Sequence, residues 1–198
     1  MSQAAHAEEY TSLGYPHRKV GFWAFLGSEC MFFGSLIGTY MAYTGASLEG
    51  PYPQDVFSIA VTTWSTFILL FSSFTMVMAL HFVRVDNRLG AGFFLMATAV
   101  GGLAFVGFQA FEFTEFYSQG LTLEKNLYGS TFFVLTGFHG AHVSGGILWL
   151  LSLFVMNARG QLGPAKEMDV EIAGLYWHFV DIVWIIIFTF VYLLEFAK

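Results

Sequence analysis

Five long apolar stretches take up most of this 198-residue sequence, and they constrain the fold more than any other feature. A helix needs about 20 apolar residues to cross about 30 Å of hydrocarbon at a rise of about 1.5 Å per residue. Five stretches meet that length, approximately at residues 20–43, 56–83, 91–117, 128–157 and 172–195. The sequence therefore predicts an all-α membrane protein in which five transmembrane helices form one bundle.

Composition agrees with a chain that lies mostly in lipid. Hydrophobic residues make up 56% of the sequence and charged residues 11%, against about 25% charged in an ordinary soluble domain. We expect a polar N-terminal tail at residues 1–17 and one membrane domain at residues 18–198. The tail has no basic residue before Pro16 and no short apolar core, so it does not have the pattern of a cleavable secretory signal.

Basic residues favour one orientation of the five spans. Two isolated lysines, Lys125 and Lys198, fall on one side of the predicted membrane, and the other basic residues fall on the opposite side. These are Arg18, Lys19, Arg84, Arg88, Arg159 and Lys166. Because cytoplasmic loops carry the excess of Lys and Arg, the N-terminus is predicted in the cytoplasm and the C-terminus outside.

The small numbers of basic residues and cysteines exclude several other kinds of site. No basic cluster exceeds Arg18-Lys19, and nucleic-acid binding needs a clustered basic surface. Cys30 is the only cysteine, which excludes an intrachain disulfide and a cysteine-rich metal site.

Small residues indicate where helices approach one another, because lipid supplies no hydrophobic drive for helix association. Gly34 and Gly38 have the GxxxG spacing in the first span. Gly137, Ala141 and Gly145 step by four along one face of the fourth span. We predict that both sets form packing seams.

Ionisable residues inside the spans are candidate functional groups, since each costs a few kcal/mol or more in lipid. Glu29 and Asp181 each lie about 14 Å into spans that run in the same direction. Three pairs share a helix face at i,i+3 spacing, namely Glu112 with Glu115, His139 with His142 and His178 with Asp181. The sequence therefore predicts buried carboxylates at Glu29, Asp181 and Glu112 and a buried polar network containing His139, His142 and His178.

Several roles are open to these groups. They could ligate haem or a metal, relay protons or bind lipid headgroups, or they could hydrogen-bond internally and fix the helix register. Internal hydrogen bonding is the favoured interpretation for the histidines, whereas both kinds of role stay equally open for Glu29.

Five short segments, taken in chain order, form a more specific pattern. They are Ser28-Glu29 with Phe32-Phe33, Gln109-Ala110-x-Glu112, Tyr128-Gly-Ser-Thr-Phe-Phe133, Thr136-Gly-Phe-His-Gly-x-His-Val143 and Tyr176-Trp-His-Phe-Val-Asp-x-Val-Trp184. This series resembles subunit III of the haem-copper terminal oxidases, which comprise the cytochrome c and quinol oxidases. The resemblance runs from about Arg18 to Glu195, and the sequence lacks two helices that longer family members have ahead of Glu29, as the short bacterial forms do.

The resemblance implies a multi-pass, non-catalytic subunit in the bacterial inner membrane. Such a subunit holds no metal or redox centre, while haem and copper lie in the partner subunit I, which reduces oxygen to water and pumps protons. It contacts subunit I and other oxidase subunits, binds phospholipid, supports proton uptake and protects the enzyme during turnover. By position, Glu29 corresponds to the family's buried carboxylate, and His139, His142, His178 and Asp181 correspond to its buried polar network.

Two other functions remain as alternatives. In a b-type haem membrane cytochrome, His139 or His142 would pair across the bundle with His178 or His81. A proton-coupled carrier would use Glu29 and Asp181, although five proline-free spans without internal repeats fit poorly with the broken helices of carriers.

Overall fold

The computed structural model describes residues 11, 14–46, 59–124 and 126–194, and these are helical apart from turns and short connections. Within the described residues five helical stretches are long and apolar enough to cross a membrane, which confirms the predicted fold class. The helices are α2 (His17–Tyr43), α4 (Ile59–Arg84), α5 (Arg88–Ser118), α6 (Leu127–Ala158) and α7 (Glu167–Ile187). A 3₁₀ turn at Pro164–Lys166 precedes α7, and a π-helix at Phe188–Leu193 continues it.

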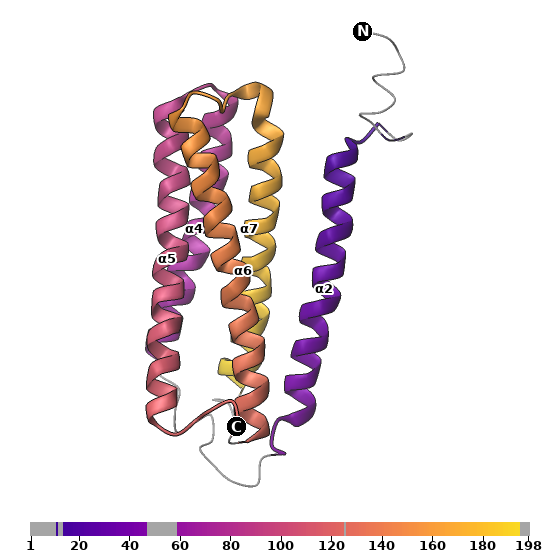
Figure 1. Cartoon of the computed structure of the whole chain (residues 1–198), viewed down its shortest axis with the longest axis vertical. Coiled ribbons are helices and arrows are strands. Elements are labelled where there is room, and N and C mark those ends of the chain that lie inside the picture. The colour runs from indigo at the N-terminus through magenta and orange to yellow at the C-terminus, as the bar shows by residue number, and fades with distance from the viewer. Residues whose placement is uncertain (1–10, 12–13, 47–58, 125, 195–198) are drawn as a thin grey trace.

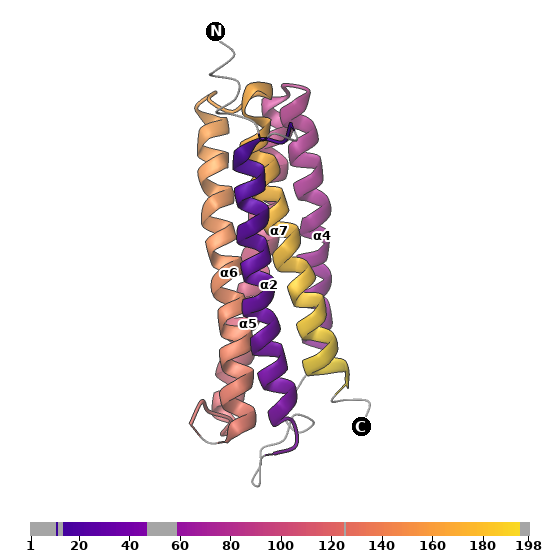
Figure 2. The same ribbon diagram turned by 90° about the vertical axis from the view of Figure 1, so that its right-hand side faces the viewer.

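The helices form an antiparallel four-helix bundle with a fifth helix on its side. Helices α4, α5, α6 and α7 alternate in direction, and α2 runs alongside them in the same direction as α7 (Figure 1). Figure 2 shows α2 in front of α6 and α7, while α4 lies beyond α7. The contacts agree, because α2 touches α6 and α7 but makes no comparable contact with α4 or α5. Helix α2 is therefore the least enclosed of the five spans.

Asparagine side chains cap two of the helices. The Asn87 side chain accepts a hydrogen bond from Gly90 N at 3.0 Å at the start of α5. Asn126 does the same for Gly129 N at 2.7 Å at the start of α6. Each cap satisfies a backbone N–H that the first helical turn leaves without a partner. Hydropathy alone did not show these caps, and α5 and α6 accordingly begin slightly before the predicted spans.

The helix that contains the last predicted span extends beyond the predicted start at Ile172. Helix α7 begins at Glu167, and Glu167 and Asp169 lie in its first turn. Acidic side chains are favourable there because the helix N-terminus carries a partial positive charge. An apolar run therefore marks where the span enters hydrocarbon, not where the helix begins. The predicted limits at Val56 and Glu195 lie outside the described residues.

Glycines that permit close helix contacts within the chain are not the predicted ones. A Cβ at Gly102 would lie 2.5 Å from Trp177, and one at Gly146 would lie 2.9 Å from the same indole. By contrast, no atom lies within 4 Å of a Cβ placed at Gly34, Gly38 or Gly137. A Cβ at Gly145 would meet only the Tyr176 hydroxyl, at 3.9 Å, and Ala141 is exposed.

The predicted seams thus correspond to no close contact among the described residues. The real seam forms around Trp177, whose size requires glycine opposite it on both α5 and α6. Packing at the predicted positions stays a prediction for contacts outside this chain.

Candidate functional site

The carboxylate of Glu29 on α2 meets the imidazole of His142 on α6. Glu29 Oε2 lies 3.2 Å from His142 Nε2, and the two side chains are 17% and 20% exposed. His142 Nδ1 lies 2.7 Å from the Phe138 carbonyl oxygen, which can only accept, so Nδ1 carries a proton. The proton between Nε2 and Oε2 can then reside on either group, and both arrangements form a hydrogen bond. The sequence showed no such partner for Glu29 because His142 comes from another helix.

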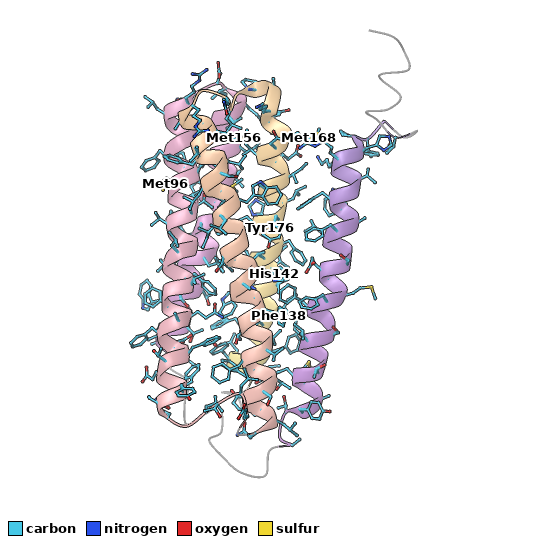
Figure 3. All side chains as sticks on the ribbon, viewed as in Figure 1. Met96, Phe138, His142, Met156, Met168 and Tyr176 are labelled. Atoms are coloured by element: carbon cyan, nitrogen blue, oxygen red, sulfur yellow. The ribbon has the colours of Figure 1, made fainter. Side chains whose placement is uncertain are left out.

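Aromatic rings surround this contact. The ring centroids of Phe33 and His142 are 4.9 Å apart, and those of Phe32 and Phe138 are 5.3 Å apart. The Tyr176 hydroxyl donates to the His142 carbonyl at 3.0 Å. In Figure 3, Phe138, His142 and Tyr176 lie between the main bundle and α2. The contact therefore lies in a largely apolar layer, where few water molecules compete for the hydrogen bond.

His178 and Asp181 on α7 meet through a serine of α4. Ser73 Oγ lies 2.9 Å from His178 Nδ1 and also donates to Asp181 Oδ2. Asp181 is 2% exposed, whereas His178 stays partly exposed. The i,i+3 spacing correctly put both side chains on one face, but a third residue from another helix joins them. We name this group the Ser73 cluster.

Glu112 on α5 is buried against α4 at the far end of the bundle from the basic residues. It is 5% exposed and accepts a hydrogen bond from the Thr62 hydroxyl. Glu115, one turn further along, is exposed. The pair predicted from spacing is thus divided between the interior and the surface.

His139 is fully buried but stands apart from the other histidines. Its ring stacks on Trp184, with centroids 4.9 Å apart, and meets Phe105 edge-on at 5.7 Å. Neither ring nitrogen has a hydrogen-bond partner among the described residues. The residues predicted to form one polar network therefore lie in three environments: His142 with Glu29, His178 with Asp181, and His139 among aromatic rings.

The serines and threonines of α4 are functional residues that the sequence analysis did not identify. The indole of Trp177 donates to Ser72 Oγ and that of Trp184 donates to Thr66 Oγ1, each at 2.9 Å. Together with Thr62 and Ser73, they make α4 the helix that supplies hydrogen-bond partners to α5 and α7. The sequence did contain a signal for this role. The span is otherwise apolar, and serines and threonines in membrane helices commonly hydrogen-bond to neighbouring helices.

Ion pairs join the helices at the end of the bundle that carries the basic residues. Arg18 contacts Asp169 at 2.6 Å and Lys19 contacts Glu171 at 2.6 Å, both from α2 to α7. Arg18 and Asp169 also line a recess of about 170 Å³ with Trp149 and Met156. A cation beside a Trp and apolar side chains at a helix end suits the interfacial region of a membrane.

Histidines and carboxylates are also common ligands of metal ions. No group of three His, Cys, Asp or Glu side chains that could hold a metal ion occurs in the part of the chain that the structure describes. His139 is fully buried among aromatic rings, and both nitrogens of His142 have protein partners.

Comparisons with known proteins give a consistent result over nearly the whole chain. The family model for cytochrome c oxidase subunit III matches residues 3–196. Cytochrome c oxidase subunit 3 of Bacillus sp. (strain PS3) is 35% identical over 190 residues, which cover 96% of this chain and 92% of that protein. Quinol oxidase subunit 3 of Bacillus subtilis (strain 168) is 35% identical over 199 residues, covering 98% of both chains. A probable quinol oxidase subunit 3 of Staphylococcus haemolyticus is 38% identical over 177 residues, covering 89% of this chain and 88% of that protein.

Proposed function

Because this chain belongs to the cytochrome c oxidase subunit III family, it is a subunit of a respiratory terminal oxidase, and we propose that it supports the catalytic subunit I. In this proposal haem and copper reside in subunit I, where oxygen is reduced to water and protons are pumped. This chain keeps proton uptake effective, binds phospholipid and prolongs the life of the enzyme during turnover. The complex lies in the bacterial inner membrane, as the bacterial relatives suggest.

The contact between Glu29 and His142 is the observation that carries this proposal. It ties the least enclosed helix, α2, to α6 at about half the depth of the membrane. A hydrogen-bonded pair that joins two helices of one subunit stabilises an arrangement of helices. The pair does not by itself assemble the groups that a catalytic centre needs, and this favours a supporting role over a catalytic one.

Two features support phospholipid binding. The recess beside Arg18 places a cation, its partner Asp169 and a Trp at the membrane boundary, where the polar part of a phospholipid lies. A second recess, of about 440 Å³, lies between α4 and α5 and is lined by Val61, Ala104, Gly107, Phe108 and Phe111. Its apolar lining suits an acyl chain. We propose both as lipid contacts of the assembled oxidase.

The basic residues support the proposed orientation. The described ones outside the spans lie at one end of the bundle, where α2, α5 and α7 begin and α4 and α6 end (Figure 1). Their acidic partners on α7 do not cancel the bias, because acidic residues contribute little to topology. We propose that this end faces the cytoplasm.

The alternative functions gain no specific support. For a b-type cytochrome, the aromatic rings that enclose the fully buried His139 would have to move before a haem could reach it, and both nitrogens of His142 already have partners. For a carrier, the helices bearing Glu29 and Asp181 show no proline break.

A Glu29→Gln variant in the fully assembled oxidase tests the proposal. We expect the initial rate of oxygen reduction to be retained and the enzyme to inactivate faster during continued turnover. Glu115→Gln, which changes an exposed carboxylate on α5, is the matched control and should inactivate at the wild-type rate. Immediate loss of all activity in a complete Glu29→Gln complex would refute the supporting role. A reducible haem band in the optical spectrum of the separated subunit would refute it independently.

A further inference from the structure

A ring nitrogen of His178 is left without a partner at a depth where lipid cannot supply one. Nδ1 of this imidazole is engaged by Ser73, but Nε2 has no hydrogen bond to any described residue. The Nε2 atom is not fully buried, because the side chain is partly exposed, so a group outside the chain can reach it. His142 differs, since both of its nitrogens have partners within the chain.

The position along α7 excludes the usual partners of such an atom. His178 lies six residues after Ile172, where the apolar run of α7 enters the hydrocarbon, so it is about 9 Å inside that boundary at helical rise. The imidazole therefore lies within the hydrocarbon core, which is about 30 Å thick. Acyl chains offer no hydrogen bond there, and an unsatisfied polar group costs several kcal/mol. Lipid headgroups lie beyond that boundary, farther away than a hydrogen bond reaches.

Asp181 contributes a second atom of the Ser73 cluster that has no hydrogen-bond partner in the described part of the chain. Its Oδ1 atom is buried and has no hydrogen bond among the described residues, while Oδ2 is held by Ser73. The single hydroxyl hydrogen of Ser73 can serve only one neighbour at a time. Ser73 donates that hydrogen to Asp181 while its oxygen accepts from His178 Nδ1–H, so Asp181 Oδ1 and His178 Nε2 are left without partners among the described residues, and Nε2 is the accessible one.

We propose that the surface of α4 and α7 around His178 docks a membrane-spanning helix of another oxidase subunit, which presents a hydrogen-bonding side chain to His178 Nε2. This inference rests on the membership of the oxidase complex and adds to the supporting role the face through which this chain is held. A helix is the required occupant because it brings a polar side chain into the hydrocarbon core with its own backbone satisfied.

The rim of this surface is open to such a helix. Ile182 and Ile185 follow His178 by four and seven residues on the same side of α7, and they are 56% and 43% exposed. Across the seam with α4, Val77 and Leu70 are 52% and 37% exposed. Apolar side chains at these positions would surround the polar contact and exclude lipid from it, as rim contacts do in other interfaces.

A photoreactive side chain at position 182 tests the proposal in the intact oxidase. p-Benzoylphenylalanine replaces Ile182, which leaves the Ser73 cluster unchanged, and a matched complex carries the probe at Leu103, a 53% exposed position on α5. After illumination, we expect position 182 to form an adduct with another subunit of the purified oxidase, identified by mass spectrometry, in much higher yield than position 103. Adducts with lipid alone, no adduct at 182, or equal yields at both positions would overturn the proposal.

Substitutions of His178 test the hydrogen bond itself. His178→Phe keeps a ring but removes both nitrogens, whereas His178→Gln retains a polar end group. We expect His178→Phe to weaken retention of this subunit in the detergent-purified oxidase about three- to fifteenfold, as for one interhelical hydrogen bond in a membrane, and His178→Gln to restore much of it. Equal retention of wild type and His178→Phe would contradict the proposal. The crosslinking result stands by itself if His178→Phe fails to fold.

Discussion

The imidazole of His139 lies against the indole of Trp184, with ring centroids 4.9 Å apart and ring planes inclined by 25°. Phe105 and Phe33 approach the same imidazole edge-on, with centroids at 5.7 and 6.3 Å. His139 therefore acts as one aromatic ring among others. Its two nitrogens have no partner among the described residues, so the ring is held by packing and not by hydrogen bonds.

His139→Phe should accordingly leave the subunit as stable as the wild type or make it more stable. A buried polar group without a partner costs about 1–3 kcal/mol, and phenylalanine removes that cost while keeping a ring. We expect the midpoint of thermal unfolding in detergent to stay constant or rise by a few degrees. His139→Ala removes the ring and should lower the midpoint clearly. A fall in His139→Phe as large as in His139→Ala would show that the nitrogens have an essential partner.

Gly102→Ala should destabilise the isolated subunit, whereas Gly34→Ala should not. The added methyl group at position 102 would meet Trp177 at 2.5 Å, and overpacking of this kind costs about 1–3 kcal/mol. At position 34 nothing lies within 4 Å, so the change should stay within about 0.5 kcal/mol. Unfolding of both variants under identical detergent conditions checks this. If Gly34→Ala lowers retention in the oxidase without changing the isolated chain, the predicted seam faces another subunit.

Glu29 and His142 should show a measurable coupling energy. In a double-mutant cycle with Glu29→Gln and His142→Leu, we expect a coupling of about 0.5–1.5 kcal/mol, the range found for interhelical hydrogen bonds in membranes. The unfolding free energies of the wild type, the two single variants and the double variant supply the cycle. Ser144→Ala, whose hydroxyl bonds within α6, pairs with Glu29→Gln as a control that should show no coupling. Additive effects of Glu29→Gln and His142→Leu would mean that the contact contributes nothing to stability.

Reversing the ion pair between Lys19 and Glu171 should restore what each single change removes. Lys19→Glu places two carboxylates where the structure has a contact of 2.6 Å, and the exchanged pair Lys19→Glu with Glu171→Lys re-creates the attraction. Both partners are partly exposed, so the effect should be about 0–1 kcal/mol and should weaken at high salt. Hydrogen exchange in the first turns of α2 is the measurement. The exchanged pair keeps the number of cations on that side, so topology is unaffected.

Hydropathy was enough to find the five helices, because the cost of placing an unpaired backbone or a charge in lipid acts on each segment separately. The ordered motifs around Glu29, His139 and Trp184 were likewise enough to indicate the family, which the comparisons confirm. Hydropathy did not show that α7 begins at Glu167, because its acidic first turn precedes the apolar run and is stabilised by the helix end.

The contacts of the polar side chains could not be read in the same way. An i,i+3 spacing tells which residues share a helix face, but the face it meets depends on how each helix is rotated and which helix lies beside it. For this reason Glu29 has His142 as its neighbour, Asp181 has Ser73, and His139 packs against aromatic rings with no hydrogen bond to a described residue.

The sequence by itself determined that this chain spans a membrane five times and carries ionisable groups within the spans, since both are properties of local segments. Only the tertiary structure decided that Trp177 needs Gly102 and Gly146 opposite it, and that α4 supplies the hydroxyl partners of α7. Those outcomes depend on the relative positions of whole helices. The same dependence leaves His178 Nε2 without a hydrogen-bond partner among the described residues.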